Sequence, residues 1–60
     1  MEMNQIRSIA RRLYDRHGLK AEAEAARKLQ EAESTGNEED AATWRRVRSV
    51  VHDMRGAHQG

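Results

Sequence analysis

The sequence predicts an all-α fold, a small antiparallel three-helix bundle, and three observations support this prediction. No proline interrupts the 60 residues, and the glycines are Gly18, Gly36, Gly56 and Gly60. Glycine just past a periodic segment is a common helix end, because it adopts left-handed φ at little cost. Between these glycines, apolar residues recur at three- and four-residue spacing. Short connections favour antiparallel neighbours; the alternative is a helical hairpin that completes its core by dimerising.

The first helix is predicted over residues 3–17. Its apolar face consists of Ile6, Ile9, Ala10, Leu13 and Tyr14. The pair His17-Gly18 ends it, and we expect Leu19 to fold back onto the last turn, as apolar residues often do after a glycine stop. For His17 we expect a structural role, because an imidazole at the C-terminal end of a helix suits the helix dipole.

The second helix is predicted over residues 20–33, because "KAEAEAARKLQEAE" consists of strong helix formers. Glu24 and Lys28 are four residues apart and are expected to pair. The inward face is predicted to hold Leu29 and several alanines, namely Ala21, Ala25, Ala32 and, alongside them, Ala26. Because alanine fills little volume, we expect this helix to lie close to its neighbours.

The third helix is predicted over residues 38–55. Asn37 is expected to cap it, with Asp40 reaching back in the manner of a capping box. The acidic run Glu38-Glu39-Asp40 suits the positive end of the helix dipole and needs no metal to explain it. The apolar stripe is Trp44, Val47, Val50, Val51 and Met54. The domain is thus expected to span residues 1–56, followed by a frayed tail at 57–60.

Eight residues are predicted to form the structural core: Ile6, Ile9, Leu13, Leu29, Trp44, Val47, Val51 and Met54. We expect Trp44 to be mostly buried, against Leu13 or Ile9 of the first helix and Leu29 of the second. A chain of this size buries only about 60% of its unfolded surface. Small domains usually add a disulfide, a metal or a second subunit. Cysteine is absent, so a protein partner or a homo-oligomer is expected.

Five arginines are candidate contacts for a partner or for phosphates: Arg7, Arg11, Arg12, Arg45 and Arg48. Two basic helices can bind phosphate backbones through such side chains. The alternative is that they form a solvated surface and pack their stems over a small core. The formal net charge is only +1, from 11 basic and 10 acidic residues, whereas a dedicated nucleic-acid binder is usually far more basic.

The sequence argues against an enzyme. Its serines and threonines stand in no catalytic motif, and so short a chain has little room for both a core and a catalytic pocket. The histidines, His17, His52 and His58, lack the close spacing of zinc ligands. We therefore expect no catalytic residue, no metal and no cofactor. No apolar run resembles a signal peptide or a membrane span, so a cytoplasmic protein without a membrane partner is expected.

Three features have a familiar spacing: His17-Gly18, Gly36-Asn37 and Trp44, with "WRRVRSVVHDM" beginning at the tryptophan. The pattern resembles a family of short, uncharacterised helical proteins from alphaproteobacteria, and the resemblance covers most of the chain. One departure is Asn37, where Asp is expected more often; both residues cap helices. The resemblance implies a small helical bundle of bacterial origin and supplies no activity.

The leading functional prediction is a small non-catalytic protein-interaction module, or an accessory or regulatory subunit of a larger partner. It is based on the thin core and on the lack of a catalytic motif. The alternative is a weak nucleic-acid-associated regulator that uses the arginine-rich helix faces.

Overall fold

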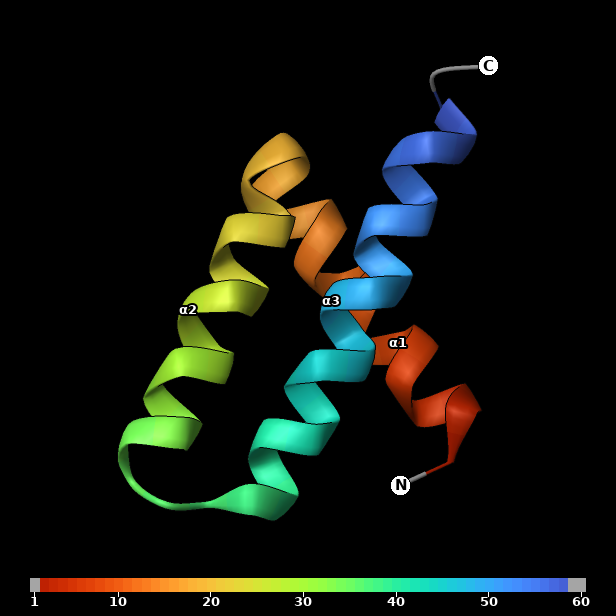
Figure 1. Cartoon of the computed structure of the whole chain (residues 1–60). Coiled ribbons are helices and arrows are strands. Elements are labelled where there is room, and N and C mark those ends of the chain that lie inside the picture. Colours follow the sequence, from red (N-terminus) through yellow and green to blue (C-terminus); the bar gives the residue numbers. More distant parts are fainter. Residues whose placement is uncertain (1, 59–60) are drawn as a thin grey trace.

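A computed structural model describes residues 2–58, which are helical except at the ends and the connections, with no strand in that range. The elements are α1 (Met3–His17), the short 3-10 helix η1 (Gly18–Lys20), α2 (Ala21–Ser34) and α3 (Glu38–His58). α2 and α3 run antiparallel side by side, and α1 packs across both (Figure 1). The predicted all-α fold is confirmed.

The helix bounds follow the glycines, with one exception. α1 has the expected bounds, and α2 begins and ends one residue later than expected. α3 continues to His58 instead of ending at Arg55, so the prediction of a tail from residue 57 is wrong for 57 and 58; residues 59–60 lie outside the described part. The physical reason is Gly56. It does not adopt positive φ as Gly18 and Gly36 do. It therefore continues the helix, although glycine inside a helix destabilises it by about 1 kcal/mol relative to alanine.

The corner between α1 and α2 is formed at Gly18, as predicted. Its φ is 59° and its ψ is −127°, and its N–H donates to the Tyr14 carbonyl. The chain then enters η1 and α2 directly, so Leu19 lies on the outside of the corner and is 73% exposed. The expectation that Leu19 folds back onto α1 is therefore wrong, because no extended segment follows the glycine.

Gly18→Ala should lower the free energy of unfolding by about 1–3 kcal/mol, the usual cost of a strained backbone conformation. A methyl group there meets no atom within 4 Å, so the loss comes from the backbone alone. Gly56→Ala is the matched control: it also meets open space, lies inside α3 and should stabilise by up to about 1 kcal/mol. Urea unfolding of both variants checks this. Equal effects at the two sites would contradict the assigned role of Gly18.

The turn between α2 and α3 is held by local hydrogen bonds. The backbone N–H of Asn37 donates to the Ala32 carbonyl at 2.9 Å, and Gly36 has a φ of 75°. The Asn37 Oδ1 accepts from the Asp40 N–H at 3.1 Å, so Asn37 is the predicted cap. Asp40 does reach back, but its carboxylate accepts from the Asn37 side-chain amide at 3.0 Å. These two hydrogen bonds join the α2–α3 turn to the first turn of α3.

The core lies where the three helices meet. One cluster consists of Ile6, Ala10, Ala21, Ala25, Val47 and Val51, all without exposed surface; Ile9, Leu13, Met54 and Trp44 pack against it from the margin. A second cluster near the α2–α3 turn consists of Leu29, Ala32 and Ala41. Large apolar side chains come from α1 and α3, whereas α2 contributes mainly alanine.

Trp44 packs against both clusters and is only partly buried. The sequence predicts that this ring packs against Leu13 or Ile9 and against Leu29, and the structure places it between the two clusters to which these residues belong. It lies at the edge of the α3 stripe, beside a surface hollow that also contacts Lys28 and Ala32. Its neighbour in the second cluster is Ala41, which the sequence reasoning missed. Trp44 therefore joins two small clusters and is not the centre of one.

Candidate interaction surface

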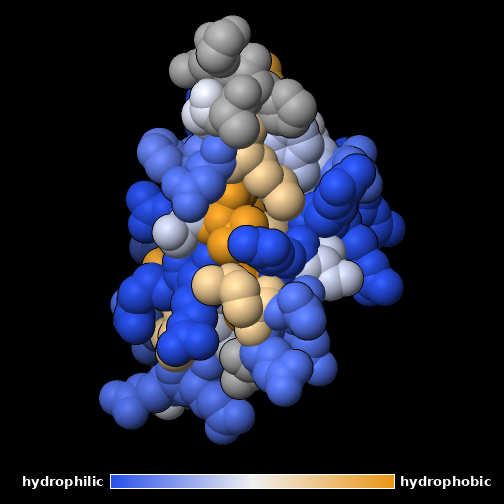
Figure 2. Space-filling model, turned by 90° about the vertical axis from the view of Figure 1, so that its right-hand side faces the viewer, coloured by the Kyte–Doolittle hydropathy of each residue, from blue (hydrophilic) through white to orange (hydrophobic). Residues whose placement is uncertain are grey.

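A surface groove runs between α1 and α3 on the side away from α2. Its walls are Met3, Arg7 and Arg11 from α1, and Val50, Asp53 and Met54 from α3, and its volume is about 450 Å3. We call it the α1–α3 groove. Met3 is 53% exposed, and Val50 and Met54 are partly buried. Figure 2 shows this side of the molecule, where hydrophobic side chains form a patch surrounded by hydrophilic ones.

The groove follows from helix periodicity. Met3, Arg7 and Arg11 are spaced four apart, and Val50 and Met54 are also four apart, so each set lies along one edge of its helix. These edges flank the faces that supply Ile6, Val47 and Val51 to the core. Glu22 of α2 contacts α3 at His52 and Arg55, which do not line the groove, and no residue of α2 is among its lining residues. The groove is therefore the uncovered margin of the core.

The structure separates the five candidate arginines. Arg7 and Arg11 lie together in the α1–α3 groove, whereas Arg12 lies beside Asp15 and Arg16 in a different surface depression. Arg45 faces Glu33 of α2 at 3.6 Å, and Arg48 is exposed on α3. Within the described side chains, Arg7, Arg11, Arg12 and Arg48 form no ion pair. Only Arg7 and Arg11 are thus brought to one site.

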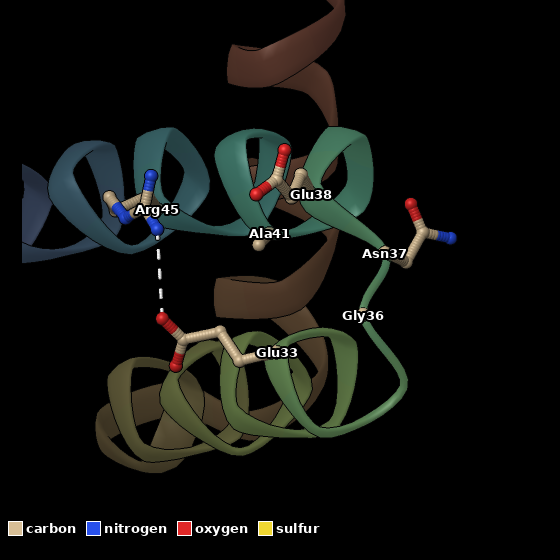
Figure 3. Close-up of a pocket in the computed structure, with 6 residues that line it drawn as sticks. All are labelled: Glu33, Gly36, Asn37, Glu38, Ala41 and Arg45. Carbon is tan, nitrogen blue, oxygen red and sulfur yellow. Dashed lines mark ion pairs between the residues drawn. The ribbon is translucent and has the colours of Figure 1, made fainter.

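A second hollow lies at the α2–α3 turn, with a volume of about 420 Å3. Figure 3 shows Arg45 reaching from α3 toward Glu33, while Asn37 lies at the start of α3, away from both charged groups. The remaining residues around it are Gly36, Glu38 and Ala41. Because Glu33 and Arg45 already face each other and Asn37 caps α3, this hollow offers little free binding capacity. It is a consequence of the turn.

The sequence reasoning missed an ion-pair network between α2 and α3. Glu22 of α2 accepts from Arg55 Nη1 at 2.9 Å and lies 3.3 Å from His52 Nδ1. The hydrogen bond with His52, followed by the one from Arg55, lowers the pKa of the Glu22 carboxyl below its ordinary value. The partner of His52 is 30 residues away in the sequence, so no local pattern indicates the contact.

Within α2, Glu24 pairs with Arg27 at 2.6 Å, and Arg27 also lies 3.4 Å from Glu31. Among the described side chains Lys28 forms no ion pair with Glu24, and the predicted pairing is limited to a charge interaction that, after the hydrogen bond from Arg27, also lowers the pKa of the Glu24 carboxyl. Arg27 is three residues away and places two nitrogens on one carboxylate oxygen, which the single ammonium of lysine cannot do. This contact lowers the pKa of Glu24 and raises that of Arg27.

Glu22→Gln should lower the melting temperature at neutral pH. Because the folded pKa of Glu22 is depressed, its stabilising contribution is present above the ordinary glutamate pKa and is lost as pH falls through the folded value. The difference between the two proteins should therefore shrink below about pH 4. Thermal melts across pH measure it. The same substitution in a chain already carrying His52→Gln and Arg55→Gln should have a much smaller effect; an equal effect would show that the network is not the cause.

The described side chains contain no group of three histidine, aspartate or glutamate residues placed to hold a metal ion. His17 is exposed at the end of α1, and its structural role stays a prediction; the His58 side chain lies outside the described part. No helix within residues 2–58 combines the length and the apolar character needed to cross a bilayer.

Comparisons of the chain with family models, with curated proteins and with solved structures give no match. The resemblance to short alphaproteobacterial proteins stays a prediction.

Proposed function

We propose that this chain is a small, non-catalytic protein-interaction module that binds its partner through the α1–α3 groove. The observation that carries the proposal is the set of apolar side chains that line one groove, the exposed Met3 and the partly buried Val50 and Met54. The rim of this groove holds three charged side chains that form no ion pair within the described side chains. Apolar centres with polar rims are the usual anatomy of protein interfaces, where methionine and arginine are enriched. Methionine also adapts its shape to a partner.

Two threonine hydroxyl groups serve the fold, which favours binding over catalysis at these positions. Thr35 donates to the carbonyls of Glu31 and Ala32, and Thr43 donates to the carbonyl of Glu39. Each of these hydroxyls serves the backbone of its own helix, and neither lies beside a histidine. A nucleophile needs an adjacent base in a sheltered pocket. The proposed setting is the cytoplasm, a reducing compartment in which proteins rarely depend on disulfides, and this chain has no cysteine.

Photo-crosslinking in the producing cell tests this function. A photoreactive amino acid placed at Met3, which is exposed in the groove, should give a covalent adduct with a protein. The same probe at Gln30, which is exposed on α2, is the matched control and should give little. Adding Val50→Glu to the Met3 probe should remove the adduct, since a carboxylate in an apolar contact is costly. Equal labelling from both positions would count against the groove as a binding surface.

The second candidate is a weak nucleic-acid-associated regulator. It is favoured by the arginines that form no ion pair within the described side chains, Arg7, Arg11, Arg12, Arg16, Arg46 and Arg48. Fluorescence anisotropy with duplex and single-stranded oligonucleotides at low and moderate salt separates the two candidates. Micromolar affinity that falls steeply with salt would support this second function. On duplex, the logarithm of the binding constant should fall against the logarithm of the salt concentration with a slope of about 0.9 per phosphate contact. Absence of binding at low salt would exclude it.

A further inference from the structure

The rim of the α1–α3 groove carries charges of opposite sign on its two walls. Its α1 wall holds two cations, Arg7 and Arg11, and its α3 wall holds one carboxylate, Asp53. No ion pair joins these walls within the described side chains. The groove therefore presents one basic edge and one acidic edge, with Met3, Val50 and Met54 between them.

This pattern selects among possible occupants. A strongly acidic partner would meet Asp53, and a strongly basic one would meet Arg7 and Arg11; each contact would place like charges together, which disfavours binding. A surface with both signs on opposite edges is complementary to itself after a twofold rotation. In such an isologous contact, each basic edge faces the acidic edge of the other copy, and the apolar centres meet on the axis.

The size of the chain points the same way. Within the described residues, the only large side chains with less than 2% exposure are Ile6, Val47 and Val51, and small folds commonly gain stability by oligomerisation. A standard interface covers about 800 Å2 on each partner, about one sixth of the 4607 Å2 surface of this chain. The groove lies on a molecule with extents of 37 × 22 × 17 Å, so a long helical face is large enough to supply that area.

We propose that the occupant of the α1–α3 groove is a second copy of this chain, in a twofold-symmetric dimer. Met3, Val50 and Met54 are covered at the centre, and Arg7 and Arg11 face Asp53 of the partner subunit. This inference rests on the proposed function, because it names the partner of the same groove.

Charge exchange tests the dimer directly. The wild-type protein should show a concentration-dependent mass in sedimentation equilibrium between micromolar and millimolar concentration. Asp53→Arg alone, and the double variant Arg7→Asp with Arg11→Asp alone, each give both edges one sign and should weaken self-association at least tenfold. An equimolar mixture of the two variants should form a heterodimer with an affinity within a few-fold of the wild type. All three side chains are exposed, so the variants should fold, and circular dichroism confirms this.

Two results would overturn the proposal. One is a wild-type protein that stays monomeric at 6.9 kDa throughout the concentration range. The other is a dimer that neither charge exchange weakens, which would place the contact elsewhere. The proposed function is tested separately from the dimer. If the Met3 probe forms an adduct with a different protein while the purified chain is monomeric, the groove is a binding surface and only the proposal of a second copy is wrong.

Discussion

Trp44→Ala should lower the free energy of unfolding by about 3 kcal/mol. Truncation of a fully buried tryptophan costs about 3–5 kcal/mol, and Trp44 is partly buried, which puts the effect at the low end. The ring contacts both the cluster around Val47 and the one around Leu29, so its loss also separates them. A small domain has a total stability of only about 5 kcal/mol, and the melting temperature should fall by well over 10 °C.

Leu19→Ala is the control for this measurement. Leu19 is the most exposed large apolar side chain of the described residues, and its truncation should change stability by less than about 0.5 kcal/mol. A Trp44→Ala protein with unchanged melting but lost self-association would show that the ring serves a partner and not the fold.

Ala25→Leu should lower the free energy of unfolding by about 2–3 kcal/mol, since extra methylenes in a packed core force strain. Ala25 has no exposed surface and lies in the cluster with Ala21, Val47 and Val51. The alanine at this position is what lets α2 approach the other two helices. Urea unfolding monitored by circular dichroism measures the loss.

Ala23→Leu is the matched control for Ala25→Leu. It makes the same change on the exposed side of the same helix. The two substitutions therefore change helix propensity equally, but Ala23→Leu adds no volume to the core, and its free energy of unfolding should change by less than about 0.5 kcal/mol. If the two variants are equally stable, the core around Ala25 can accommodate a leucine side chain, and the close approach of α2 inferred from its alanines is wrong.

The helices could be predicted because their signals are local. Gly18 and Gly36 adopt positive φ and end α1 and α2, and Asn37 caps α3 through its own side chain. Gly56 shows the limit of this reasoning. It has the same identity and follows the same kind of stripe, yet α3 continues through it, because no turn there requires left-handed φ.

The contacts between helices could not be predicted in the same way. The pairing of Glu22 with Arg55 spans 33 residues and depends on how far α2 is shifted along α3. The α1–α3 groove likewise depends on how α1 crosses α3. Helical spacing places Arg7 with Arg11, and Val50 with Met54, but only packing brings these two edges together. Candidate arginines were therefore identified without the apolar groove that gives two of them a role.

The most direct test of the α1–α3 groove as the contact surface uses its own methionines. In protein labelled with ¹³C at the methionine methyl groups, a soluble nitroxide broadens the signals of exposed methyl groups. The signals of Met3 and Met54, which line the groove, should be broadened at micromolar concentration and protected near millimolar concentration. The methyl groups of Leu19, labelled in parallel and absent from the groove lining, should stay broadened throughout. Met3 and Met54 signals that remain as accessible as those of Leu19 at every concentration would contradict a dimer built on this groove.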